Sequence, residues 1–128
     1  MDNRLTIDYY TDILCVWAWI AQRRIDELDE QLGAAIELQY HYVDVFGDTR
    51  EKMRAQWADR GLYDGFSEHV ISSAAPFENA PINPRIWSEV RPATSANAHL
   101  VLKAVEISCG EKASIFKYEC IWRTHRSG

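Results

Sequence analysis

The stretch that decides the fold is residues 4–43, which read RLTIDYYTDILCVWAWIAQRRIDELDEQLGAAIELQYHYV. Apolar and polar side chains alternate over residues 4–10 and again over residues 36–43, which is typical of half-buried strands. Between the two, residues 16–32 place apolar side chains three to five positions apart and predict a helix of about four turns. Gly33 follows the last periodic residue and ends this helix. The order strand, helix, strand predicts a βαβ unit with parallel strands and a right-handed crossover.

Helical patterns dominate the chain after Asp48. Residues 49–61 and 62–73 predict two short helices. Residues 74–93 hold all four prolines and predict an irregular linker. The chain therefore belongs to the α/β class, with a strand-containing half over residues 1–48 and a helical half over 49–128, in a single structural domain.

A longer helix follows the linker. Thr94 or Ser95 is expected to cap it, and it is expected to run to about Ser108. A last helix is expected from near Glu111. The apolar side chains that share one face of the first of these helices are Leu100, Ala104 and Ile107.

Size and composition bound the class of protein. The chain has 128 residues, of which 47% are hydrophobic and 26% charged, which is enough for one domain with a real core. The net charge of −5 argues against a general nucleic-acid binder. The polar amino terminus lacks a signal-peptide pattern, and no stretch approaches the roughly 20 apolar residues of a membrane span. We therefore expect a cytoplasmic protein without membrane or nucleic-acid partners.

The sequence lacks the motifs of disulfide frameworks, zinc sites and dinucleotide-binding units. The chain has three cysteines, an odd number, and they are widely spaced: Cys15, Cys109 and Cys120. This fits neither a disulfide framework nor a zinc site. No glycine-rich loop joins the first strand to the helix, which argues against a standard dinucleotide-binding unit. We expect no metal site.

Cys15 is the strongest candidate for chemistry. It follows a strand and lies at or just before the first turn of a helix, where the free amides of Trp17 and Ala18 point toward it. The positive end of the helix dipole favours the thiolate, which is the nucleophile in disulfide exchange. The alternative is that Cys15 is a small buried apolar residue at a helix start.

The segment DYYTDILCVWAWIAQRRIDEL, residues 8–28, resembles the opening of DsbA-like oxidoreductases of the thioredoxin fold. In that family a strand leads to a Cys-Pro-Trp-Cys-type motif and a helix. Kappa-class glutathione transferases and 2-hydroxychromene-2-carboxylate isomerases share this frame, with serine in place of the first cysteine. Residues 92–110, PATSANAHLVLKAVEISCG, resemble the start of the helical insertion in these proteins. The resemblance implies a thioredoxin-like βαβ unit followed by a mainly helical insertion.

Two departures from the family pattern matter. Ala18 stands where a dithiol enzyme has its resolving cysteine, so the sequence Cys-Val-Trp-Ala from Cys15 cannot close its own disulfide. No proline of this chain matches the cis-proline loop, and the carboxyl-terminal half of the thioredoxin fold does not follow before Gly128. We interpret the sequence as a fragment of a longer protein.

The resemblance predicts a monothiol oxidoreductase with Cys15 as nucleophile and with Trp17, Ala18 and Trp19 lining a substrate pocket. The partner would be a thiol or disulfide substrate, with glutathione as co-substrate and no tightly bound cofactor. The alternatives are a glutathione-dependent isomerase or transferase, and a non-catalytic thioredoxin-like binding module. For both tryptophans, packing in the core is the competing interpretation.

Other polar residues have simpler interpretations. His99, on an otherwise apolar helix face, is expected to be buried with its hydrogen bonds satisfied, and Asp12 is expected to help form the turn before the helix. Asp44 and Asp48 flank a loop after the second strand. Two parallel strands make an incomplete sheet, because parallel sheets are normally covered and flanked. We therefore expect the chain to self-associate as a homo-oligomer.

Overall fold

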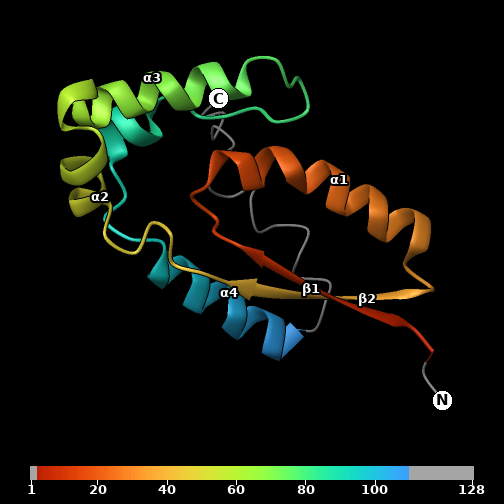
Figure 1. The fold of residues 1–128 in the computed structure, drawn as a ribbon. Coiled ribbons are helices and arrows are strands. Elements are labelled where there is room, and N and C mark those ends of the chain that lie inside the picture. Colours follow the sequence, from red (N-terminus) through yellow and green to blue (C-terminus); the bar gives the residue numbers. More distant parts are fainter. Residues whose placement is uncertain (1–2, 110–128) are drawn as a thin grey trace, which may run out of the picture.

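The computed structural model describes residues 3–109 and begins with the predicted βαβ unit (Figure 1). Strand β1 (Leu5–Thr11) leads through a short junction into helix α1 (Val16–Leu32), and strand β2 (Ile36–Tyr42) returns beside β1. The two strands are parallel and pair from Leu5 opposite Ile36 to Thr11 opposite Tyr42. The predicted α/β start is confirmed, with helix α1 over the predicted residues and the strand ends within one residue.

Helices then cluster beyond the carboxyl ends of the strands (Figure 1). They are α2 (Thr49–Gln56), a short 3-10 turn at Ala58–Arg60 and α3 (Leu62–Ala74). Asp48 caps α2, since its side chain accepts a hydrogen bond from Glu51 N. The predicted helix over residues 49–61 is interrupted at Trp57, whose backbone leaves the helical region with φ of −125°. The chain then turns at Gly61, where φ is 89°, a value that glycine adopts without strain.

The proline-rich segment is irregular except for a π-helical turn, η2 (Ile86–Val90). It is followed by α4 (Ala96–Cys109), whose amino terminus lies where the sequence predicts a cap: Ala96 N donates to Thr94 Oγ1. The side chains expected to share one face of this helix are exposed: Leu100 and Ile107 are 69% and 78% exposed, and Ala104 is exposed as well. The helix lies beside β2, to which Lys103 donates at the Tyr40 carbonyl (Figure 1). The helix expected from Glu111, with Cys120, lies outside the described residues, as does the Cys109 side chain.

The core lies between the start of α1 and the helical half. Trp19 and Trp87 are among its most deeply buried side chains, and Phe46 and Phe66 pack on Trp87 with ring centroids 5.5 and 4.9 Å away. Burying such aromatic surface is the main source of stability in a domain of this size. The core thus holds the start of α1, and with it Cys15, against the helices.

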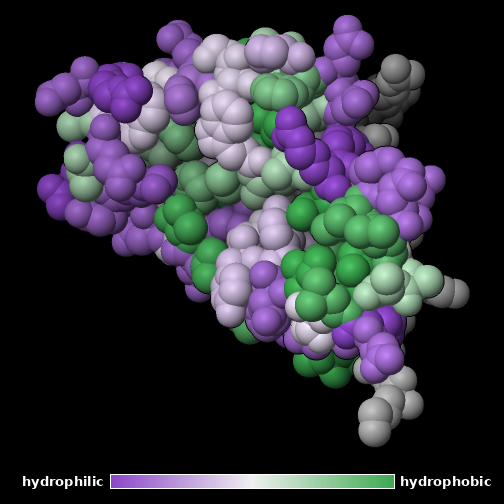
Figure 2. Space-filling view, turned by 45° about the vertical axis from the view of Figure 1, so that its right-hand side comes forward, coloured by the Kyte–Doolittle hydropathy of each residue, from purple (hydrophilic) through white to green (hydrophobic). Residues whose placement is uncertain are grey.

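One side of the molecule is less well covered. Figure 2 shows an apolar surface patch on the side where β1 begins and α1 ends. Leu5, the first residue of β1, and Leu32, the last residue of α1, are both exposed. Such a patch on a small domain is a common site of association.

Candidate functional site

Cys15 occupies the N-cap position of α1, with extended backbone angles of −80° and 116°. Its carbonyl accepts the first intrahelical bond, from Trp19 N at 3.1 Å. Within residues 3–109, no side-chain hydrogen bond caps α1, and its first turn carries no acidic residue. The amides of Trp17 and Ala18 therefore belong to the unsatisfied set at the start of α1, the end at which Cys15 is the N-cap residue.

The thiol is half-buried, and Cys15 packs against the edge of the hydrophobic core. The structure separates the three residues predicted to line its pocket. Trp17 is 53% exposed and Ala18 is half-buried, but Trp19 is only 1% exposed. Trp19 donates from Nε1 to the Pro81 carbonyl at 3.0 Å, which fixes it in the core. Of the three predicted residues, Trp17 and Ala18 thus keep exposed surface and Trp19 does not.

Tyr9 is a half-buried residue of β1 that the sequence does not single out. Burial raises the pKa of its phenol, a hydrogen bond with the Thr11 side chain lowers it, and the charges of Cys15 and Asp26 raise it. Because burial is the largest of these effects, the phenol keeps its proton at neutral pH.

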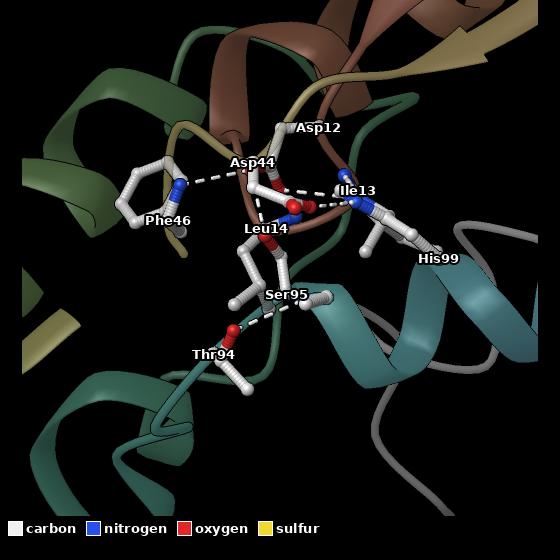
Figure 3. A network of polar contacts seen from close by, with 9 residues as sticks. Asp12, Ile13, Leu14, Asp44, Phe46, Thr94, Ser95 and His99 are labelled. Carbon is white, nitrogen blue, oxygen red and sulfur yellow. Dashed lines mark hydrogen bonds and ion pairs between the residues drawn. The ribbon is translucent and has the colours of Figure 1, made fainter. Parts of the chain in front are cut away.

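A buried carboxylate organises the junction between β1 and α1 (Figure 3). Asp12 is 2% exposed. Its Oδ1 accepts from Leu14 N at 2.8 Å, and its Oδ2 accepts from Phe46 N at 2.9 Å and from Ser95 Oγ at 2.8 Å. The bond to Leu14 confirms the expected turn. Burying the Asp12 carboxylate away from water costs free energy, and these three hydrogen-bond donors offset that cost.

His99 lies on the other side of the same junction (Figure 3). Its Nε2 accepts from the backbone N–H of Ile13 at 3.1 Å, so Nδ1 carries the proton and donates to Asp44 Oδ1 at 2.8 Å. The ring of Tyr42 stacks on it at 4.8 Å. The expectation of a buried, satisfied histidine is confirmed.

Ser95, His99 and Asp12 are the residue types of a hydrolytic triad, but their arrangement is different. Ser95 is fully buried and donates to Asp12, while His99 Nε2 accepts from a backbone amide. The serine hydroxyl therefore bonds to the Asp12 carboxylate and not to a histidine, which is the base that activates the nucleophile in a hydrolytic triad. The network is a structural clamp at the base of the Cys15 site.

The sequence does not predict that Asp44 and Ser95 join this network. Asp44 is 55 residues from His99, and Ser95 is 83 residues from Asp12. The signal in the sequence that could have linked Ser95 to His99 is their spacing. Residues four apart at the start of a helix have their side chains on the same face.

The described residues contain no group of three or more histidine, cysteine, aspartate or glutamate side chains arranged to hold a metal ion. Among the helices of residues 3–109, none is long and apolar enough to cross a membrane. Comparison with known protein families, with curated proteins and with solved structures finds no match to this chain.

Proposed function

We propose that the chain is a DsbA-like, thioredoxin-related module that exchanges thiols and disulfides through Cys15. The observation that carries this proposal is the place of Cys15 at the N-cap of a helix of 17 residues, directly after a strand. A thiolate there interacts with the first-turn amides and with the positive end of the helix dipole. The order of β1, Cys15, α1 and β2 supports the thioredoxin-like part of the proposal.

The chemistry needs two exchange steps. The Cys15 thiolate attacks one sulfur of a disulfide, the bond from Cys15 Sγ to that sulfur forms, and the other sulfur leaves as a thiolate. Because Ala18 offers no second thiol, a thiolate from outside must then attack the mixed disulfide and release Cys15. Glutathione, a small thiol of reducing compartments, would serve in that second step. The exposed Trp17 would contact the incoming substrate.

A direct test is formation of a mixed disulfide with oxidised glutathione at neutral pH, mapped by mass spectrometry. We expect modification of Cys15 in the folded chain to be faster than in the chain unfolded in urea. Cys15→Ser should abolish the fast reaction, while the matched variants Cys109→Ser and Cys120→Ser should retain it. Fast modification of Cys109 or Cys120 with Cys15 unmodified would refute the proposal.

A second candidate is a non-catalytic binding module. The contact of Cys15 with the hydrophobic core favours it, because a thiol held in apolar surroundings is inert. The same experiment separates the two functions. A Cys15 that reacts more slowly in the folded chain than in the unfolded chain would select the binding module.

A further inference from the structure

The backbone before α1 is held by a run of hydrogen bonds. Cys15 N donates to the Asp12 carbonyl at 3.1 Å, and Leu14 N donates to the Asp12 side chain at 2.8 Å. Both bonds are local and would form in many turns. Ile13 N instead donates to His99 Nε2, 86 residues away. This bond therefore joins the bonds of Asp12 with Phe46 and Ser95 in orienting the junction relative to the rest of the molecule.

His99 is itself fixed from several sides. Its side chain is 6% exposed, its Nδ1 donates to Asp44, and Tyr42 stacks on its ring. One turn earlier on α4, Ser95 donates to the Asp12 carboxylate. The amino-terminal turn of α4 thus holds the junction at two points, and Figure 3 shows both side chains directed toward it.

We propose that His99 is a positioning residue for Cys15. By accepting a hydrogen bond from the Ile13 amide, its Nε2 fixes the position of the thiol at the amino-terminal end of α1. This inference rests on the proposed function of Cys15. Ile13 is 1% exposed, so loss of the acceptor would leave a buried N–H unsatisfied. That N–H would then compete for the Asp12 carboxylate, whose Oδ1 lies 3.6 Å from His99 Nε2 and already accepts from Leu14.

The consequence at the thiol follows from the geometry of the turn. A shifted Asp12 turn moves the Cys15 backbone, whose own amide is bonded to the Asp12 carbonyl. The Cys15 side chain then moves relative to the amino-terminal end of α1, where Cys15 is the N-cap residue. The electrostatic support of the thiolate by the helix end falls off within the first turn, so a small displacement weakens it.

The test measures iodoacetamide labelling of Cys15 by peptide mapping in His99→Leu, His99→Gln and His99→Asn. The readout is the ratio of the labelling rate at neutral pH to the rate at about pH 9.5, where an ordinary thiol is mostly ionised, so that changes in accessibility cancel. Gln reaches the position of Nε2 and can accept from Ile13 N. Asn keeps a donor for Asp44 but is too short to reach Ile13.

We expect the ratio to fall by about two- to fivefold in His99→Leu and His99→Asn, in line with the strength of a helix-end interaction, and to be retained in His99→Gln. Two variants serve as controls. His41→Leu removes the histidine–aspartate pair that His41 makes with Asp8, and Val70→Ala destabilises the core in α3. Neither should change the ratio.

An unchanged ratio in His99→Asn, or an equal fall in His99→Gln, would overturn the positioning proposal. Should His99→Leu fail to fold, the comparison of Gln with Asn still decides. Failure of the proposed function looks different: the wild-type thiol would be labelled but would not form a mixed disulfide faster when folded.

Discussion

Ser95 Oγ donates to Asp12 Oδ2 at 2.8 Å, and both side chains are buried although they are 83 residues apart in the sequence. This bond ties the amino terminus of α4 to the junction between β1 and α1. Because Asp12 also accepts from Leu14 and Phe46, its carboxylate joins three segments of the chain.

We expect Asp12→Ala to lower the free energy of unfolding by about 3 kcal/mol or more, because it leaves buried donors without their charged acceptor. Ser95→Ala should cost about 1–2 kcal/mol, since it removes one donor and leaves the carboxylate two others. Urea unfolding of both single variants and the double variant measures their coupling. Asp8→Ala, at an exposed aspartate of β1, is the control and should change stability by less than about 1 kcal/mol. Additive effects of Asp12 and Ser95 would contradict the proposed link.

Gly65 is expected to tolerate no side chain. A Cβ at this position would lie 1.6 Å from the Arg60 carbonyl oxygen, which is backbone and cannot move aside alone. Gly65→Ala should therefore lower the free energy of unfolding by about 3 kcal/mol or more. Glu68→Ala, an exposed position of the same helix, is the matched control. Equal thermal midpoints for the two variants would show that the turn before α3 can relax.

Local pattern predicts the βαβ start and α1 correctly because each strand and helix there has a clear period and α1 ends at a glycine. The exposure of Leu100 and Ile107 on α4 does not follow from their spacing, because the side of the helix that meets the junction carries His99, with Ser95 just before the helix. Burial of His99 could be expected from its apolar neighbours in the sequence. Its hydrogen bonds to Ile13 and Asp44 could not, because the loops that bring these residues together have no periodic pattern.

Tyr40 makes stability depend on alkaline pH. Burial raises the pKa of its phenol to about 12 from 10.0, while a hydrogen bond from Gln22 Nε2 opposes the shift. The unfolded chain loses this proton first as the pH rises, so stability is complete below pH 10 and falls as the pH approaches about 12.

In Tyr40→Phe this part of the alkaline loss should disappear. The loss is about 1 kcal/mol at pH 11 and up to about 2–3 kcal/mol at about pH 12, and the substitution costs about 1 kcal/mol at neutral pH for the lost hydrogen bond. Urea unfolding at pH 8 and pH 11 measures the difference. Tyr10→Phe, at an exposed tyrosine, is the control and should follow the wild type. Parallel pH dependences for Tyr40→Phe and the wild type would contradict the assignment.

The outer edge of β1 is expected to mediate self-association. Leu5 N donates to the Ala35 carbonyl and Val43 N to the Thr11 carbonyl, so alternate residues of β1 pair inward and the amides of Thr6, Asp8 and Tyr10 point outward. Among residues 3–109 no strand pairs with this edge, and the apolar patch of Figure 2 lies at the end where β1 begins. An open edge beside apolar surface favours pairing with a second copy.

Thr6→Pro tests this edge without breaking the sheet. Proline removes the outward N–H of an exposed residue and leaves the inward bonds of its neighbours to β2 intact. We expect the wild type to show a larger mass on light scattering as its concentration rises, and Thr6→Pro to remain monomeric over the same series. Thr6→Ala keeps the amide and should associate like the wild type. A wild type that is monomeric at every concentration would exclude self-association. Equal association of Thr6→Pro and the wild type would place the interface elsewhere, because only a contact through the β1 edge depends on the Thr6 N–H.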